Sequence, residues 1–352
     1  MINSAIICYI ACHGASADHF QTFVKKVQSD SISYRVFAEK SVRAKFEENG
    51  VSVDMLFSLD TDPEEIAKKC MDASIVITDV GNIYSEHVQK ALARIAPKVS
   101  RFAYYDNPEV YVPGGYSATA AKVMLAAEGV LFANKNLAND TLYQEEGVPV
   151  DLSGHTKIGI GYYPLSSVEE VIEARKASHV DGKCIVYFGG NNEVYFSKAF
   201  PSFLRLIEEA IEKRDLSEYV IMLQQHPAAK QKNIDGQQFL ALQKAYENTA
   251  HAPKLILSAV SSKDAQVLAD AALYYQTSMA PQFVLTGIAT SQIGHDTYSD
   301  VLIKNALIAS ITKKEELLDF LDQCKIQSQD TPVLFKGLGI DPEWPKQLLF
   351  EW

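Results

Sequence analysis

Short apolar runs alternate with amphipathic stretches along the first half of the chain. Apolar runs of strand length lie at 5–11, 33–38, 51–59, 73–78, 101–105, 130–133 and 157–161. Helical patterns bounded by capping residues, glycine or proline lie between them, at 17–27, 41–49, 63–71, 84–95, 118–127 and 137–146. Strict alternation of buried strands with helices predicts an α/β fold with a parallel, doubly wound sheet.

The same alternation restarts after residues 162–167, which we interpret as a hinge. Strands are expected at 184–188, 219–224, 255–260, 271–276 and 288–293. Helices are expected at 168–177, 231–249, 262–269 and 313–323, and residues 300–307 should cover an edge of the sheet. A further helix should end at Arg214 and be interrupted at Pro201, and a short one should lie between Pro281 and Gly287.

The restart of the pattern predicts two Rossmann-like, doubly wound parallel-sheet domains. We place them at 1–165 and 166–335, followed by a tail at 336–352 that contains both tryptophans and packs back on the first domain. Ligands of such sheets bind at the carboxyl ends of the strands, so we expect the site in a cleft between the two halves.

Composition supports this organisation and excludes several classes of protein. The chain has 352 residues, of which 47% are hydrophobic and 22% charged, more than one core comfortably holds. Its net charge of −11 excludes bulk attraction to nucleic acid or anionic lipid, although a local basic pocket remains open. The five cysteines, at 8, 12, 70, 184 and 324, form no metal-ligand pattern and are typical of a reducing compartment. The N-terminus lacks a basic leader region, and no apolar run reaches the about 20 residues of a membrane helix. We therefore predict a cytoplasmic protein with no transmembrane segment.

Small, imidazole and hydroxyl side chains follow successive strands of the second half. They are Gly189 and Gly190, His226 and Pro227, Ser261, and Thr277 with Ser278. Glycine lets a backbone approach a phosphate closely, and a hydroxyl at a helix start accompanies free N–H groups and a positive dipole end. The pattern predicts a pocket for a phosphate and a nucleotide that needs no metal and no cofactor. Turn formation, helix capping and a structural histidine remain the alternative explanations.

The arrangement of these residues resembles a known group of enzymes. A strand followed by His226-Pro227, and a later strand followed by Thr277-Ser278 at a helix start, is similar to the donor half of GT-B glycosyltransferases. Bacterial sialyltransferases, Kdo and capsule transferases, and CDP-glycerol transferases share the pattern and use cytidine-linked donors. The resemblance implies that His226, Thr277 and Ser278 contact the nucleotide and phosphate of such a donor.

The first half offers two residues for proton transfer. Asp106 ends the strand at 101–105, and bacterial sialyltransferases carry their base in an Asp-Gly or Asp-Asp-Gly segment at this place. Here Asn107-Pro108 replaces the glycine. His13 follows the first strand and is the second candidate for taking the proton of an acceptor hydroxyl. A loop cap for Asp106 and a simple strand end for His13 are the structural alternatives.

Taken together, these residues predict a metal-independent, inverting glycosyltransferase. Its partners would be a nucleotide-sugar donor and a glycan or lipid-linked acceptor. One alternative is a nucleotide-sugar epimerase of the UDP-sugar 2-epimerase type, which needs several carboxylates where this chain offers mainly Asp79 and Asp106. The other is a non-catalytic, two-lobed protein that binds a small ligand.

Two further pairs of polar residues have more than one explanation. Asp60 and Asp62 have the spacing of a metal-binding pair, but Asp62-Pro63 followed by two glutamates predicts a helix cap instead. His295-Asp296 follows the strand at 288–293 and could either bind sugar hydroxyls or close a turn.

Overall fold

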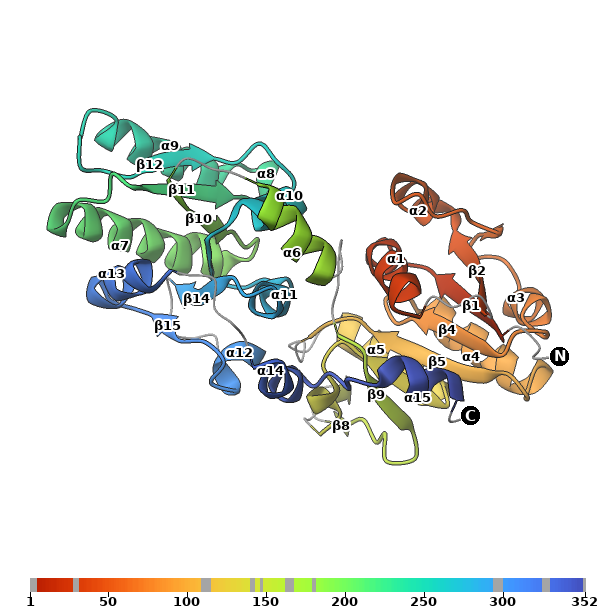
Figure 1. The fold of residues 1–352 in the computed structure, drawn as a ribbon. Helices are drawn as coiled ribbons and strands as arrows, with labels where there is room; N and C mark the ends of the chain where they lie inside the picture. Colours follow the sequence, from red (N-terminus) through yellow and green to blue (C-terminus); the bar gives the residue numbers. More distant parts are fainter. Residues whose placement is uncertain are drawn as a thin grey trace. The chain divides into compact units, whose positions relative to one another are not determined.

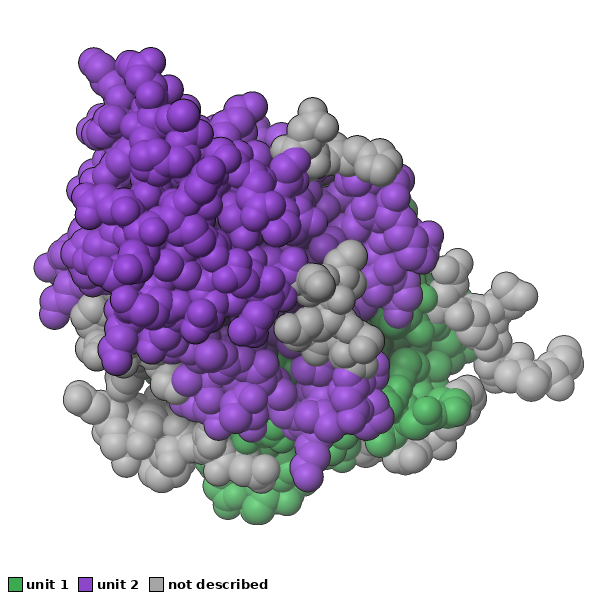
Figure 2. Space-filling view, turned by 60° about the vertical axis from the view of Figure 1, so that its left-hand side comes forward, with its two compact units in different colours: residues 1–166, 338–352 green, residues 167–337 purple. Residues whose placement is uncertain are grey.

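The computed structural model of the chain describes residues 5–27, 32–108, 115–139, 143–145, 148–161, 168–178, 182–293, 300–324 and 330–350. The chain forms two compact units, distinguished by colour in Figure 2. Unit 1 comprises Met1–Ser166 and Leu338–Trp352, and unit 2 comprises Ser167–Gly337. Within the described residues, no helix is long and apolar enough to cross a membrane.

Unit 1 is built on a sheet of seven described strands, all parallel, in the order β3-β2-β1-β4-β5-β6-β9. The strands are β1 (Ala5–Ala11), β2 (Ile32–Glu39), β3 (Met55–Phe57), β4 (Ile75–Asp79), β5 (Ser100–Tyr105), β6 (Gly129–Phe132) and β9 (Thr156–Gly159). The helices are α1 (Ala15–Val27), α2 (Arg43–Glu48), α3 (Pro63–Lys69), α4 (Ile83–Ile95), α5 (Gly115–Ala126) and α15 (Trp344–Phe350).

Alternate residues of β1 face opposite sides of this sheet. Ile7 and Tyr9 pack in a buried cluster with residues of α1, α2 and α15, whereas Cys8 and Ile10 pack with α3 and α4. In the C-terminal segment of unit 1, Trp344 stacks on Phe23 of α1 with 5.7 Å between ring centroids. Helices therefore cover both faces, as a doubly wound sheet requires (Figure 1).

The predicted helix at 137–146 is wrong. Residues Lys135–Asn139 form a 3-10 turn, and Tyr143–Glu145 form a short strand, β7, that pairs antiparallel with β8 (Val148–Pro149). Asn139-Asp140-Thr141 are weak helix formers, and Tyr143 favours a strand, so local propensity overrides the apparent helical period here.

Unit 2 is built on a sheet of six described strands, all parallel, in the order β12-β11-β10-β13-β14-β15. The strands are β10 (Lys183–Phe188), β11 (Tyr219–Gln224), β12 (Lys254–Leu257), β13 (Ala271–Tyr274), β14 (Ala289–Ile293) and β15 (Ser310–Ile311). The helices are α6 (Val168–Ala177), α7 (Phe200–Lys213), α8 (Pro227–Lys230), α9 (Ile234–Tyr246), α10 (Ser262–Leu268), α11 (Ala280–Leu285), α12 (Val301–Lys304), α13 (Lys314–Gln323) and α14 (Thr331–Leu338).

The second sheet is also covered on both faces (Figure 1). Ile185 and Tyr187 of β10 pack in a buried cluster with α7, α9 and α13. Phe188 faces the opposite side of the strand, and its ring centroid lies 4.4 Å from that of Phe283 in α11. The two sheets confirm the predicted α/β fold of two Rossmann-like, doubly wound, parallel-sheet domains.

The predicted interruption at Pro201 is wrong. A π-helical turn at Tyr195–Ala199 runs directly into α7, and Pro201 lies in the first turn of that helix. Because proline has no N–H to donate, it fits at a point where the wider turn has already changed the hydrogen-bonding pattern.

The six strands of the unit 2 sheet follow the same order as the first six strands of the unit 1 sheet, to which β9 adds a seventh at the edge. Each sheet has a topological switch point beside its first strand in the chain. In unit 1 the switch point lies between β1 and β4, and in unit 2 it lies between β10 and β13. Open α/β sheets bind ligands outside the carboxyl ends of the strands at such a point. The residues that follow β1, β4, β10 and β13 are therefore the first to consider.

Candidate functional site

At the switch point of unit 1, Asp79 holds the loop between β1 and α1 in place. Its Oδ2 accepts hydrogen bonds from the backbone N–H of Cys12 at 2.6 Å and of His13 at 2.8 Å, and from the Ser16 hydroxyl at 2.8 Å. Its Oδ1 accepts one from the Ser85 hydroxyl at 3.0 Å. Burial raises the pKa of Asp79 above its ordinary value, and these hydrogen bonds oppose the rise. Asp79 is therefore a positioning residue whose two oxygens are occupied.

Asp106, at the end of β5, is in a different environment. Its Oδ1 accepts a hydrogen bond from the Tyr116 hydroxyl at 2.7 Å, and its Oδ2 lies 3.5 Å from His19 Nε2. The side chain of Asp106 is 21% exposed, whereas that of His19 is 3% exposed. Burial acts to raise the pKa of Asp106, but His19, Tyr116 and the more distant His13 together lower it below its ordinary value. Asp106 is thus an ionised carboxylate with partial access to solvent.

The other predicted base, His13, is exposed and lies in the short loop between β1 and α1. Its backbone N–H is held by Asp79, and its imidazole contributes to the lowered pKa of Asp106. The structure therefore brings His13 and Asp106 to the same edge of the sheet.

His19 and Tyr116 were not predicted as site residues. His19 lies on the buried face of α1, with its ring edge-on to Tyr104 at 5.5 Å, and Tyr116 lies at the start of α5. The proximity of Asp106 strengthens the effect of burial and raises the pKa of Tyr116 far above its ordinary value. The one sequence signal for His19 was a polar residue at a core-facing helical position six residues after His13.

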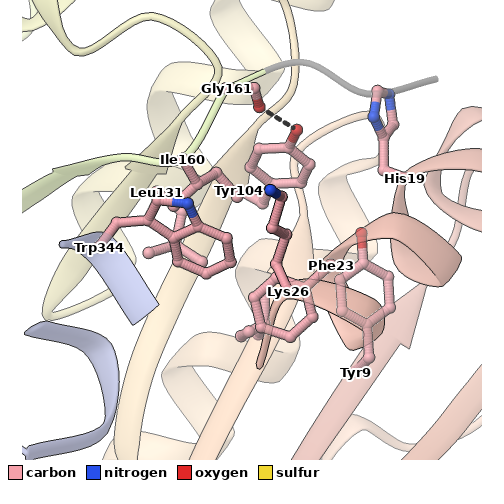
Figure 3. Close-up of a pocket in the computed structure, with 10 residues that line it drawn as sticks. Tyr9, His19, Phe23, Lys26, Tyr104, Leu131, Ile160, Gly161 and Trp344 are labelled. Atoms are coloured by element: carbon pink, nitrogen blue, oxygen red, sulfur yellow. Dashed lines mark hydrogen bonds between the residues drawn. The ribbon is translucent and has the colours of Figure 1, made fainter. Parts of the chain in front are cut away.

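A small cavity is lined by His19 and by residues of the unit 1 core (Figure 3). Its walls are mostly apolar and aromatic, including Phe23, Tyr104 and Trp344, and the Tyr104 hydroxyl donates to the Gly161 carbonyl at 3.2 Å. The cavity volume is about 10 Å³, room for a single water molecule. It cannot hold a sugar, so any substrate must meet Asp106 from its exposed side.

In unit 2, Gly189 and Gly190 follow β10, and both are buried against Tyr195. A Cβ on Gly189 would lie 2.6 Å from the Tyr195 hydroxyl, and one on Gly190 would lie 3.0 Å from the Tyr195 ring. The glycines are explained by this close packing. Two residues further on, the Asn192 amide donates to the Gln276 side chain at 2.6 Å, so the loops after β10 and β13 are tied together at the switch point.

His226 follows β11 and caps the short helix α8, whose first residue is Pro227. Its Nδ1 accepts a hydrogen bond from the backbone N–H of Ala228 at 3.1 Å. Burial lowers the pKa of His226, and the charge of Asp235 opposes this shift only in part. A neutral imidazole whose Nδ1 accepts must carry its proton on Nε2, which makes Nε2 a hydrogen-bond donor.

The predicted hydroxyls are used in local structure. Ser261 is the N-cap of α10, where its Oγ accepts from the backbone N–H of Asp264 at 3.1 Å and donates to the Asp264 carboxylate at 2.7 Å. It follows β12, the edge strand, two strands away from the switch point.

Thr277 and Ser278 do follow β13, but the prediction that they cap the next helix is wrong. The N-cap of α11 is Met279, and the Thr277 hydroxyl accepts from the backbone N–H of Met279 at 3.3 Å. Ser278 is exposed. The chain turns once more before the helix begins, because the Thr277 side chain stabilises a local turn in place of a cap.

A buried polar network behind His226 was also missed. Asp235 is fully buried and accepts hydrogen bonds from the Tyr195 hydroxyl at 3.0 Å, the Gln225 amide at 2.8 Å and the backbone N–H of Gly236 at 3.0 Å. It connects the loops after β10 and β11 to the start of α9. No motif marks these residues, because their contact depends on strand pairing.

The described residues contain no group of three or more His, Cys, Asp or Glu side chains that could hold a metal ion. Asp62 is the N-cap of α3, accepting from the backbone N–H of Glu64 at 3.0 Å, which confirms the prediction of a cap. His295 and Asp296 lie outside the described residues.

No protein-family model matches the chain, and no curated protein matches it in sequence. Solved structures match it in fold. The UDP-GlcNAc 2-epimerase from Methanocaldococcus jannaschii is 11% identical, with a TM-score of 0.68 over 98% of both chains. The UDP-GlcNAc 2-epimerase from Neisseria meningitidis bound to UDP-GlcNAc is 12% identical, with a TM-score of 0.53 over 98% of both chains. Acinetobacter baumannii MurG is 12% identical, with a TM-score of 0.52 over 98% of both chains.

Identities this low establish the fold alone. The fold is the GT-B fold, which confirms that part of the resemblance found in the sequence. The narrower resemblance to sialyltransferases and CDP-glycerol transferases stays a prediction.

Proposed function

We propose that this protein is an enzyme that acts on a UDP-activated N-acetylhexosamine and epimerises the sugar at C2. The observation that carries the proposal is the Asp106 cluster, an ionised and partly exposed carboxylate beside His19 and Tyr116 on the first sheet of a GT-B fold. UDP-GlcNAc 2-epimerases among the solved structures of the same fold support it. A uridine-linked sugar therefore replaces the cytidine-linked donor expected from the sequence.

We assign nucleotide binding to unit 2. His226 presents a neutral imidazole with Nε2–H as a donor at the carboxyl end of β11, next to the central strand β10. A fixed donor of this kind suits a phosphate oxygen. Because the pKa of His226 is lowered, the imidazole keeps this form at neutral pH.

We assign proton transfer to unit 1. Epimerisation at C2 balances as an elimination followed by an addition. A base takes the C2 proton, the C2–H electron pair forms a C1=C2 double bond, and the C1–O bond to UDP breaks. UDP then adds back to C1 while an acid returns a proton to the opposite face of C2. Asp106 is the base, since its pKa is lowered and its carboxylate has partial access to solvent. His13 is the acid, because it is exposed at the same edge and Asp79 fixes its backbone. Asp79 takes no part in proton transfer, since both of its oxygens are occupied.

Glycosyl transfer is the second candidate function, and a specific observation favours it. Of the two carboxylates at the ends of β4 and β5, only Asp106 is accessible to a substrate. A single base suffices to deprotonate an acceptor hydroxyl, whereas epimerisation needs a second proton-transfer group. The glycan or lipid-linked acceptor expected from the sequence would belong to this alternative.

Incubation with UDP-GlcNAc in D2O, followed by proton NMR, separates the epimerase from the other two functions. The epimerase gives UDP-ManNAc with deuterium at C2 and needs no acceptor. A transferase without an acceptor and a non-catalytic protein both leave the sugar unchanged. Absence of UDP-ManNAc and of deuterium at C2, together with saturable UDP-GlcNAc binding, therefore refutes the epimerase proposal.

Variants assign the roles of the two units. Asp106→Asn should lower turnover by about 10²- to 10⁴-fold while UDP binding is retained. Asp72→Asn is the matched control, because the Asp72 carboxylate is 59% exposed and pairs with Arg35. His226→Ala should weaken UDP binding by about tenfold or more, since a hydrogen bond to a charged group contributes about 1.5–3 kcal/mol. His251→Ala, which changes an exposed histidine, should leave UDP binding unchanged.

A further inference from the structure

Unit 2 contains a second cavity that the proposed function does not use. Its volume is about 520 Å³, within the range of about 300–1,000 Å³ typical of small-molecule sites. It is lined by residues of α6, by the C-terminal end of α10, by the residues that lead into β10 and β13, and by the residues that directly follow α11 and α13. Lys183 is the first residue of β10 and Asp270 directly precedes β13, so the cavity lies at the amino edge of the sheet.

Arg175 of α6 is the charged group that distinguishes this cavity. It is partly buried, and its nearest polar partner is the Thr286 carbonyl, 3.4 Å from Nη1. Among the described residues, no carboxylate lies within 4.0 Å of its guanidinium. Burial lowers the pKa of Arg175, and the charge of Asp270 only partly opposes the shift. A guanidinium carries five N–H donors in a planar fork, and among the described residues only Nη1 of Arg175 has a hydrogen-bond acceptor.

The rest of the lining favours an anion as the occupant. Lys176 and Lys183 add two positive charges, against the single carboxylate of Asp270. Oδ2 of Asp270 already accepts from the backbone N–H of Cys184 at 2.8 Å. Lys176 pairs with Glu173 and Lys183 pairs with Glu218 at the surface. Exposed ion pairs of this kind contribute little to stability, so a lysine can leave its glutamate for a bound anion. With these two pairs formed, Arg175 is the cation of the lining that has no carboxylate within 4.0 Å among the described residues.

Part of the lining is apolar. Ile172, Val267, Leu268 and Ala269 supply aliphatic surface beside the charged groups. Cys324 also lines the cavity, but burial raises the pKa of its thiol to about 12, so it supplies no thiolate. The lining thus combines cationic groups with a hydrocarbon surface.

We propose that this cavity is a second binding site, for a small organic anion that carries a phosphate or carboxylate group on an apolar body. The planar guanidinium of Arg175 binds the anionic group through two parallel N–H donors, and the rim lysines strengthen the attraction. The apolar body lies on the aliphatic part of the lining. The site is separate from His226, which lies at the opposite, carboxyl end of the same sheet.

The test uses phenyl phosphate and benzoate as probes, with phenol and inorganic phosphate as the apolar and anionic halves alone. Isothermal titration calorimetry should give a dissociation constant below about 1 mM for at least one of the first two, and weaker binding for both halves. Arg175→Gln should weaken the binding by about tenfold or more. Arg205→Gln is the matched control, because Arg205 is 54% exposed on α7 and pairs with Glu209 on the same helix.

His226→Ala should leave probe binding unchanged, since the two sites lie at opposite edges. If Arg175→Gln fails to fold, Ser178→Asp decides, because it places a carboxylate on the lining while Arg175 remains and should weaken binding. Three results overturn the proposal: no saturable binding by the wild-type protein, equal binding by the folded Arg175→Gln or Ser178→Asp variant, or loss of binding in His226→Ala. None of them depends on turnover of UDP-GlcNAc, so this site and the proposed enzymatic function can fail independently.

Discussion

Asp79 provides the sharpest test of how the edge of the first sheet is built. It accepts four hydrogen bonds, from the backbone N–H groups of Cys12 and His13 and from the hydroxyls of Ser16 and Ser85. If its role is to accept these bonds, an isosteric amide should replace it and a methyl group should not. We therefore compare Asp79→Asn with Asp79→Ala.

The structure gives the expected loss of unfolding free energy for each variant. In Asp79→Ala the N–H groups of Cys12 and His13 lose their acceptor, and each buried donor left without a partner costs about 1–3 kcal/mol. The variant should thus lose about 2–6 kcal/mol of unfolding free energy. In Asp79→Asn, Oδ1 of the amide can take the place of the carboxylate Oδ2, and Nδ2 can donate to the Ser85 hydroxyl. Because the pKa of Asp79 is raised, neutralising the group removes an unfavourable buried charge. Asp79→Asn should therefore stay within about 1 kcal/mol of wild type.

Urea unfolding followed by tryptophan fluorescence measures this effect in the correct unit. Both tryptophans, Trp344 and Trp352, belong to unit 1, so the signal reports the unit that contains Asp79. Asp72→Ala is the control for an exposed carboxylate and should change stability by less than about 1 kcal/mol. If Asp79→Asn proves as unstable as Asp79→Ala, the charge is what matters and the hydrogen-bond argument fails. If it is stable but loses C2 exchange with UDP-GlcNAc, Asp79 acts in catalysis and its assignment as a positioning residue is wrong.

Three further predictions concern stability. Gly189→Ala should destabilise unit 2 by about 1–3 kcal/mol in thermal unfolding followed by circular dichroism, because the new Cβ would overlap the Tyr195 hydroxyl. Gly154→Ala is the control and should match wild type, because no heavy atom lies within 4 Å of the new Cβ. Trp344→Ala should cost unit 1 about 3–5 kcal/mol, because the side chain is buried in its core, and a melting temperature equal to that of wild type would contradict this packing. Folding lowers the pKa of His226, so the neutral imidazole stabilises the folded protein. This contribution is complete above about pH 6.5, the pKa of histidine in the unfolded chain, and is lost as the pH falls through the pKa of His226 in the folded protein. Urea unfolding at several pH values should show a slope of up to about 1.4 kcal/mol per pH unit that His226→Gln removes.

Most strands could be predicted from the sequence because each is a short apolar run that ends at glycine, proline or a polar residue. The run at 5–11 became β1 and the run at 219–224 became β11 without a shift at either end. The errors arose where local chemistry competes with periodicity. At 137–146 weak helix formers interrupt the helical pattern, and at Thr277 a side chain that stabilises a turn displaces the start of the helix.

The candidate site was predictable only in part. Asp106, His13 and His226 are candidates from the sequence because they follow strands, and the parallel sheet carries all strand ends of one unit to one edge. Their partners were not found, because a hydrogen bond between residues far apart in sequence depends on which strands become neighbours. Asp79 and Cys12 are 67 residues apart, and Tyr195 and Asp235 are 40 residues apart. The sequence alone suggests that the glycines after β10 approach a phosphate. The folded structure shows instead that Tyr195 occupies the space a side chain would need at these positions.

Asp79 and Asp106 show why position at a strand end does not determine the chemistry of a carboxylate. They end neighbouring strands of one sheet, yet the pKa of Asp79 is raised and that of Asp106 is lowered. Asp79 is buried among donors that the fold itself supplies, so its oxygens serve the loop that carries His13. Asp106 is partly exposed, and its partners are the side chains of His19 and Tyr116 rather than backbone donors of a loop. When the environments of two carboxylates at one edge shift their pKa values in opposite directions, the ionised and accessible carboxylate is the candidate for proton transfer. Deuterium exchange at C2 should therefore respond to Asp106→Asn and remain in Asp79→Asn.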